Sequence, residues 1–501
     1  MAAAALEWVI AFGSERLVGR FTHVSGPGVL RFDWGVLLLP TTGCLVAGLI
    51  VQWLAGNERG HGVDQLTRAF HRMLGRMRLR GPAVKTATTG LVMSCGGSVG
   101  PEGPIAALGS AIGSTVGRRF GLSPRETRVL LLAGCAAGIG AIFHCPLGGA
   151  LFATSIIYRE PEFESNAIVS SFVASVIGYS TYVALRGPEH SLLAGVDALT
   201  YDSPRYLIWY ALLGPLCGLA AIGFSFGLNL FEDHLIPALR WPRWTTAALG
   251  GLITGGLACL MPQVMDGRYG FLQAALSGSL FDDPGRSWWV WAGLFSLLVI
   301  AKIFATAATV GSGAPGGVLG PSVFIGGTVG AALGAIGMAM FPGEFDEVLR
   351  QSLIPVGMAG VLAATMRTPL AAIVMVAEMT GSHGLIAPLM LVCVISYVIG
   401  RRWGLNHEQV PTAADSPVHA ADPILHLLDQ VKVGSIMETD WPLVVSPDTP
   451  LDQVVSRTEP GTRPVVAVAR DRQLLGLITP TDLGTLLASP DLPPSSSPRT
   501  R

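Results

Sequence analysis

Long apolar blocks run along the first 400 residues of the chain, and glycine and proline interrupt several of them. A membrane-spanning helix needs about 20 apolar residues, and many of these blocks reach that length. Irregular backbone is not tolerated against lipid, so the broken blocks must be buried or must line an aqueous cavity. The pattern predicts an all-α polytopic membrane protein with apolar blocks at 36–54, 128–158, 166–186, 206–230, 244–265, 288–308, 317–341, 354–379 and 384–400.

Two pairs of segments in this region resemble each other. Residues 96–117 are similar to 311–330, and 133–152 are similar to 357–375, so both pairs are offset by a little over two hundred residues. Chance similarity between Gly- and Ala-rich helices would account for one pair, but hardly for two at a matching offset. Duplicated halves with Gly- and Pro-broken segments are typical of transporters with a binding site near the bilayer midplane.

The pattern changes after the last apolar block. We assign 1–405 to the membrane domain, 406–430 to a polar linker and 431–488 to a small α/β domain. In this small domain RPVVAVARD and LLGLITP have the length and β-branched content of strands, and LDQVVSRT and TDLGTLLA have helical spacing. The low-complexity tail, 489–501, is predicted to be disordered.

Composition and charge support a membrane location. Only 13% of the residues are charged, against about a quarter in soluble proteins, and a net charge of -1 gives no sign of nucleic-acid binding. By the positive-inside rule, the basic stretch 68–85 and Arg401 with Arg402 face the cytoplasm. We therefore expect a bacterial-type plasma membrane protein with a cytosolic C-terminal domain and no cleavable signal peptide. The seven cysteines lie in apolar stretches, and no metal-ligand spacing occurs.

Glu102, in GGSVGPEGP, is the most informative single residue. A carboxylate inside an apolar, Gly-rich membrane segment is costly and points to function. We expect the glycines and prolines to break the backbone just before Ile105, so that a new helix begins there. The free amides at such a helix start bind anions. Glu102 can occupy that place when it is ionised and leave it when it is protonated, which would make it a gate.

Two further Gly-rich breaks could complete an anion site. In GSGAPGGVLGPSVF, the amides of Val318 and Leu319 can point at an ion, and Pro321 suits an early helical position. The third break is RGHGVD, residues 59–64. Backbone amides rather than lysines suit a pore, because the ion must be bound weakly enough to be released.

These motifs, in this order and spacing, resemble the CLC chloride channel and transporter family from about residue 20 to residue 415. The family's GxxGxEGP-type motif matches Gly97–Pro104, its GxFxP-type motif matches 317–321, and HCPLGGALF and RTPLAAIVMVAEMTG are also similar to family segments. The resemblance implies a homodimer of subunits, each with two inverted halves of tilted and broken helices and one chloride pore. It implies Glu102 as the gate and an anion site formed by His61, Gly62, Gly103, Val318, Leu319 and His407.

The chain departs from the family pattern at two of these positions. His61 stands where the family usually has serine, and His407 aligns with its usual tyrosine, although a histidine at the membrane surface explains His407 equally well. A neutral imidazole still donates one hydrogen bond, and a protonated one would make anion binding depend on pH.

The choice between channel and exchanger depends on one position. Family exchangers usually carry an inner glutamate where this chain has Ile156, preceded by Ser155. We therefore predict a passive chloride channel, with a proton-coupled chloride exchanger as the alternative. Glu378, in VAEMTG, is predicted to be a structural carboxylate that caps the turn after its helix.

The small C-terminal domain resembles a single CBS motif, a unit that usually occurs in pairs, which implies pairing across the dimer. Thr479 and Asp482, in GLITPTD, would then contact an adenine nucleotide, although a purely structural dimer module is as well supported. No other cofactor is predicted. An intramembrane enzyme would need a Ser/His pair, paired aspartates or HExxH within the spans; His144 has no acid partner in sequence and HExxH is absent, so we predict that the protein is not an enzyme.

Overall fold

The computed structural model divides into two compact units, Met1–Ala421 and Asp422–Arg501. It describes residues 1–18, 34–56, 62–187, 193, 195, 199–201, 203–267, 269–281, 286–381, 383–419, 443–456, 466–470 and 473–479. The first unit is helical, and the second contains a short three-stranded sheet.

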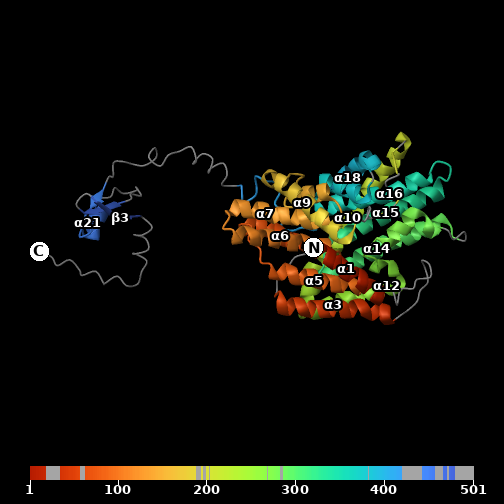
Figure 1. The fold of residues 1–501 in the computed structure, drawn as a ribbon, viewed down its shortest axis with the longest axis horizontal. Coiled ribbons are helices and arrows are strands. Elements are labelled where there is room, and N and C mark those ends of the chain that lie inside the picture. Colours follow the sequence, from red (N-terminus) through yellow and green to blue (C-terminus); the bar gives the residue numbers. More distant parts are fainter. Residues whose placement is uncertain are drawn as a thin grey trace. The chain divides into compact units, whose positions relative to one another are not determined.

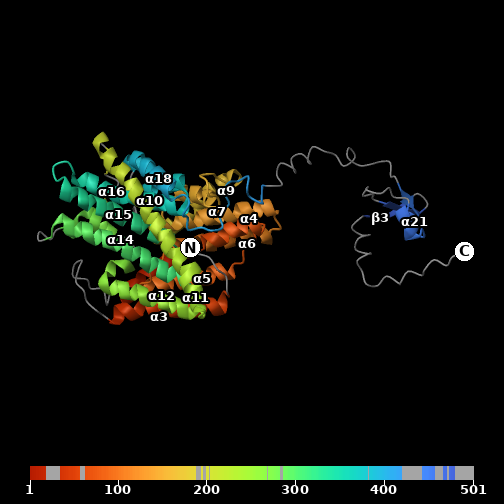
Figure 2. The ribbon, with the colours of Figure 1, turned by 180° about the vertical axis from the view of Figure 1, so that it is seen from behind.

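Two series of helices build the first unit (Figures 1 and 2). The first series is α1 (Ala2–Gly13), α3 (Trp34–Leu54), α4 (Val63–Arg72), α5 (Arg80–Ser94), α6 (Glu102–Arg119), α7 (Pro124–Ile142), α8 (Pro146–Ser155) and α9 (Ser165–Arg186). The second is α10 (Leu207–Asn229), α11 (Ile236–Leu239), α12 (Arg243–Leu260), α13 (Gly270–Ser277), α14 (Trp288–Gly311), α15 (Leu319–Met340), α16 (Glu347–Met366), α17 (Pro369–Thr380) and α18 (Ile386–Gly400). The shorter helical segments include the π-helix η3 (Leu230–Leu235), which joins α10 to α11, and the 3-10 helix η4 (Pro262–Met265), which follows α12.

Among the described residues, seven helical segments are long and apolar enough to cross a membrane. They contain α3, α9, α10, α14, α15, α16 and α18. In α15 and α16, 78% and 89% of the apolar stretch is buried inside the protein. These two helices are therefore wrapped by other helices and meet little lipid. Figures 1 and 2 show α3, α5 and α12 together at one edge of the unit and α16 and α18 toward the opposite edge.

Two of the predicted apolar blocks, 128–158 and 354–379, are each divided into two helices. A residue in the left-handed conformation follows the first helix of each pair, His144 with φ 56° after α7 and Arg367 with φ 58° after α16. The second helix starts at a proline two residues later, at Pro146 or Pro369. Proline causes the break in both places, because it lacks an N–H and disfavours helical backbone in the residue before it.

The internal repeat is confirmed by matching close contacts in the two halves. A Cβ on Gly109 would lie 2.1 Å from the carbonyl oxygen of Gly134, and a Cβ on Gly326 would lie 2.2 Å from that of Gly357. Only glycine allows backbones to approach this closely, a common device between membrane helices. The pair α6–α7 therefore packs as the pair α15–α16 does, although more than two hundred residues separate them.

Residues 406–419, which we assigned to a linker, belong to the membrane unit. The Gln409 side chain donates to the carbonyl oxygens of Ile156 at 2.9 Å and Met366 at 3.1 Å. Arg159 N–H donates to the carbonyl of Val410 at 2.8 Å. The polar side chains that suggested a linker satisfy buried carbonyl groups at helix ends, so this segment is held against the helices.

The second unit contains β1 (Val444–Val445), α21 (Leu451–Ser456), β2 (Val466–Arg470) and β3 (Gln473–Ile478). The sheet order is β1-β2-β3, with β1 parallel to β2 and β2 antiparallel to β3. The two predicted strands and the helix in LDQVVSRT are confirmed. The predicted helix at 481–488 and the tail 489–501 lie outside the described residues.

Candidate anion site

The α6 helix begins at Glu102 itself, three residues earlier than predicted, with Pro101 as its N-cap. Pro104 is accommodated because the first turn of a helix needs no donated N–H from that residue. The side chain of Glu102 is buried, with 4% of the residue exposed. The carboxylate thus lies at the start of a helix, where backbone amides are unpaired.

Three groups hold the Glu102 carboxylate. The backbone N–H of Gly320, in the first turn of α15, donates to Oε2 at 3.2 Å. The amide of Glu102 itself and the hydroxyl of Tyr269 also hydrogen-bond to the side chain. A carboxylate that accepts hydrogen bonds from two helix starts occupies a position suited to an anion.

The three Gly-rich breaks predicted from the sequence meet beside Glu102. Gly100 and Gly317 exchange two backbone hydrogen bonds, of 2.8 Å and 2.7 Å. Gly62, the N-cap of α4, has φ 90°, and a Cβ there would lie 2.4 Å from the carbonyl oxygen of Gly103. A Cβ on Gly317 would lie 2.8 Å from the amide nitrogen of Gly103. Any side chain at Gly62 or Gly317 would therefore force these backbones apart.

The remaining predicted anion ligands differ in their surroundings. Val318 is the N-cap of α15 and Leu319 is its first residue, and both are buried. Gly320 is the α15 residue that donates to Glu102. His61 lies outside the described residues.

The alignment placed His407 at the anion site, but the residue is exposed. Its neighbour Asn406 is buried and donates to Thr67 Oγ1 on α4 at 3.0 Å and to the carbonyl of Ile156 at 3.3 Å. The side-chain amide of Asn406 therefore lies on the inner side of this turn, where the resemblance had placed His407. This segment contains few motif residues, so the resemblance could not show which of two adjacent residues faces the anion site.

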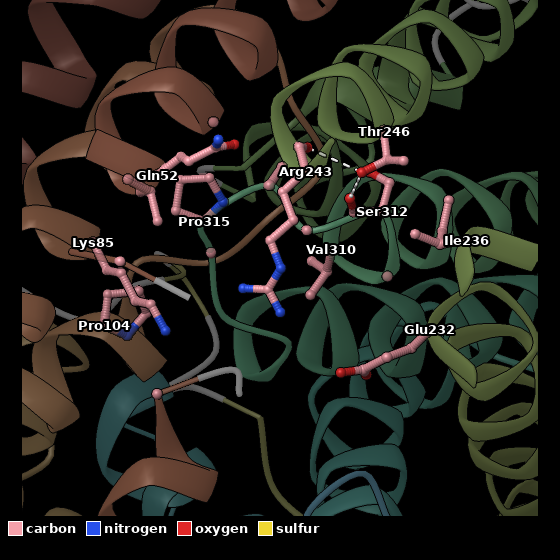
Figure 3. A pocket seen from close by; sticks show the side chains of 18 of the residues that line it. Gln52, Lys85, Pro104, Glu232, Ile236, Arg243, Thr246, Val310, Ser312 and Pro315 are labelled. Atoms are coloured by element: carbon pink, nitrogen blue, oxygen red, sulfur yellow. Dashed lines mark hydrogen bonds between the residues drawn. The ribbon is translucent and has the colours of Figure 1, made fainter. Parts of the chain in front are cut away.

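A cavity of about 270 Å³ reaches all three breaks, since Gly62, Pro104 and Gly316 are among its lining residues. Its charged lining residues are Lys85, Glu232, Asp233, Arg240 and Arg243. Figure 3 shows Arg243 projecting into the middle of the cavity, with Lys85 and Pro104 on one side and Glu232 on the other. Cations outnumber acids here, so the cavity favours anions over cations.

Glu378 has the structural role that we predicted, but with a different partner. Its two carboxylate oxygens accept hydrogen bonds from the backbone N–H groups of Leu147 at 3.1 Å and Gly148 at 2.7 Å. These amides open α8, a helix more than two hundred residues away in sequence, and not the turn after α17. A carboxylate is favourable there because it satisfies orphan donors and the positive end of the helix dipole.

Two residues in the surroundings of Glu102 were not predicted from the sequence. Lys302 lies inside the apolar block 288–308, where an ionisable residue is itself a signal of function. Tyr269 gave no signal, because one tyrosine in a loop is unremarkable in sequence. The seven cysteines are buried and free, as predicted.

Broken membrane helices that meet around a buried carboxylate define a polytopic anion transporter. The family described as "Voltage gated chloride channel" matches residues 43–401. The chain belongs to this CLC family and is an anion-transporting, multi-pass integral membrane protein.

Relatives and solved structures agree with this assignment. The "Voltage-gated ClC-type chloride channel ClcB" of Salmonella typhimurium is 32% identical over 381 residues, which cover 75% of this chain and 86% of that protein. The fold is similar to "a slow cyanobacterial Cl-/H+ antiporter" (TM-score 0.65, 20% identity, 85% of this chain and 95% of that one). It is also similar to "a CLC-type fluoride/proton antiporter" (TM-score 0.64, 20% identity, 82% and 94%). The family match ends before the region that resembles a CBS motif.

Proposed function

We propose that this protein transports chloride across the membrane through a pore that Glu102 gates. The observation that carries the proposal is the hydrogen bond between the Glu102 carboxylate and the Gly320 amide, where the three Gly-rich breaks meet. The curated relatives that are described as chloride channels support chloride as the ion.

Glu102 can act as a gate because its carboxylate and a chloride ion compete for the same backbone amides. An ionised Glu102 side chain accepts the hydrogen bonds that a chloride ion would otherwise accept. Protonation removes its charge, and a chloride ion that reaches the helix starts can displace it. Binding by backbone amides and helix dipoles, without a direct lysine contact, leaves the ion weakly held and free to move on.

We further propose passive conduction in preference to exchange. Ile156, at the position where family exchangers usually carry an inner glutamate, is fully buried. It cannot take a proton, and the neighbouring Ser155 donates to the carbonyls of Leu151 and Phe152 within its own helix. A proton crossing this apolar region as a bare ion would cost several kcal/mol or more.

One cluster favours the second candidate, a proton-coupled exchanger. Glu164 is buried and lies eight residues beyond Ile156 in the chain. Its Oε2 accepts a hydrogen bond of 2.6 Å from the Tyr158 hydroxyl and lies 2.9 Å from His419 Nε2. The histidine is partly exposed, so this pair could take protons from water and deliver them toward the buried end of α8.

Anion flux and proton movement in proteoliposomes separate these functions. We expect a chloride gradient to drive chloride efflux without proton uptake when an ionophore clamps the membrane potential. Uphill proton uptake that Glu102→Gln abolishes would exclude the channel. If Glu164→Gln also removed that uptake while Glu162→Gln did not, Glu164 would be the inner proton acceptor. An absence of any anion flux from folded protein would overturn the proposal as a whole.

We propose the remaining features on the family resemblance. They are a homodimer, a bacterial plasma membrane location, a cytosolic C-terminal domain of CBS type, and transport in place of enzyme catalysis. The exposed apolar side chains of α9 and α18 can serve a subunit interface as well as lipid; they include Val169, Val173, Ile177, Met390, Val394 and Val398. The mass of the purified particle tests the dimer.

Nucleotide binding is a separate proposal for the second unit. Thr479 follows β3 and is partly buried, whereas Asp482 lies outside the described residues. Equilibrium binding of ATP to the full-length protein, compared with a Thr479→Ala variant, tests this site.

A further inference from the structure

Tyr269 touches the gate from a strained backbone position. It precedes α13 as its N-cap, and its φ of 60° lies in the left-handed region that a non-glycine residue rarely adopts. The residue is 6% exposed, and its hydroxyl hydrogen-bonds to Glu102. The same hydroxyl lies 3.5 Å from the carbonyl oxygen of Gly320, the residue whose amide also holds Glu102. Strained residues persist only where their surroundings over-determine them, and they gather at functional sites.

The loop before Tyr269 is held from two directions. Lys302, buried in α14, donates from Nζ to the carbonyl oxygens of Val264 at 2.7 Å and Asp266 at 2.8 Å. The Asp266 carboxylate accepts a hydrogen bond of 2.7 Å from the Phe271 amide in the first turn of α13. The loop is thereby fixed on both sides of Tyr269, which accounts for the strained conformation.

Lys302 also contacts α15, in addition to the loop before Tyr269. Its ammonium group lies 4.6 Å from the centre of the Phe324 ring, on α15. That helix also supplies the Gly320 amide to Glu102. A buried lysine is costly unless its donors are used, and here two carbonyls and a ring face use them. Lys302 therefore ties the Tyr269 loop to the helix whose N-terminus meets the gate.

We propose that Tyr269 is a positioning residue for the gate, whose hydroxyl holds the ionised Glu102 side chain in the pore-blocking position. This inference rests on the proposed gating role of Glu102. The hydroxyl is a neutral donor, so it stabilises the closed carboxylate without adding a positive charge that would trap a passing anion. The charged groups facing this contact are Glu102, Asp266 and, behind Asp266, Lys302.

The effect on pH dependence has a definite sign. Flux should rise as the pH falls, because protonation releases Glu102. If Tyr269 stabilises the ionised, closed form, its loss makes release easier, and the half-maximal pH moves upward. A hydrogen bond to a charged group changes such an equilibrium by about tenfold or more, which corresponds to about one pH unit. The maximal flux at low pH should stay the same, because the open pore has lost this contact.

The test is the pH profile of chloride flux for Tyr269→Phe in proteoliposomes. We expect the midpoint to rise by about one unit, with an unchanged maximum. The matched control is Tyr210→Phe, since Tyr210 is also buried and its hydroxyl hydrogen-bonds to Ser352 at 2.7 Å, away from Glu102. In a Glu102→Gln background, Tyr269→Phe should add no further shift.

Four outcomes would count against the inference. An unshifted midpoint would overturn it, and so would an equal shift in Tyr210→Phe or in the Glu102→Gln background. If Tyr269→Phe does not fold, site-specific 3-fluorotyrosine at position 269, a stronger donor of similar shape, should move the midpoint downward. An upward movement or none would overturn the inference. If Glu102→Gln itself leaves the wild-type profile unchanged, the proposed gate fails instead.

Discussion

Gly100 and Gly317 form a two-residue antiparallel bridge between the halves of the protein, with N–H···O distances of 2.8 Å and 2.7 Å in the two directions. One glycine precedes α6 and the other precedes α15. Their pairing satisfies backbone groups that would otherwise be unpaired beside the candidate anion site. It also fixes the distance between the two helix starts that meet at Glu102.

The bridge predicts that Gly317→Ala disrupts transport. The new Cβ would lie 2.8 Å from the Gly103 nitrogen and 3.0 Å from the Gly100 oxygen, so the backbones must separate. We expect a loss of about 1–3 kcal/mol in stability and a large fall in chloride flux. Thermal unfolding and efflux assays measure both. Gly293→Ala is the matched control, because a Cβ there has no atom within 4 Å; equal behaviour of the two variants would contradict the prediction.

For the gate, we predict that Glu102→Gln raises chloride flux at neutral pH and flattens its pH dependence. The amide is neutral and competes poorly with chloride for the helix-start N–H groups. The hydrogen bonds of a charged group are each worth about 1.5–3 kcal/mol, so the rise should be about tenfold or more. Efflux between pH 4.5 and 8 measures it. Glu378→Gln, a control at another helix start, should keep the wild-type pH profile; a profile for Glu102→Gln that matches wild type refutes the gate.

The charged cavity predicts a salt-dependent change in flux. Arg243→Gln should lower chloride flux and Glu232→Gln should raise it, because both side chains line the path to Gly62. The difference should be severalfold at about 0.01 M salt and nearly absent at about 1 M, where the Debye length is about 3 Å. Arg125→Gln, an exposed residue at the start of α7, serves as the control. Changes of the same sign in both cavity variants would exclude an electrostatic cause.

The turn after α18 predicts different outcomes for two adjacent residues. Asn406→Ala removes a buried donor to Thr67 and to the Ile156 carbonyl, so we expect a loss of about 1–3 kcal/mol in stability. His407→Ala should leave stability and chloride affinity unchanged, because the side chain is exposed. Thermal unfolding and calorimetric chloride titration measure these effects. If His407→Ala alone weakened chloride binding, the prediction would fail and the histidine would be a ligand of the anion site.

Several features of the site could be predicted from the sequence because they depend on local chemistry. A carboxylate in an apolar segment, such as Glu102, is anomalous wherever the fold places it. Helix breaks follow from glycine and proline, although the start of α6 was misplaced by three residues. Lys302 carried the same kind of signal as Glu102 and was overlooked within its apolar block. The partner of Glu378 could not be found locally, because α8 and α17 meet only in the folded protein.

The sequence by itself determined the membrane location, the duplicated halves, the breaks and the buried carboxylate that we propose as the gate, since hydrophobicity, backbone conformation and buried charge are properties of short segments. Only the tertiary structure decided which groups surround that gate. Gly320 and Tyr269 come from segments more than 160 residues from Glu102, and Asn406, not His407, points inward at its turn. Such contacts depend on how helices pack, and close packing between distant segments leaves no local pattern that a sequence could display.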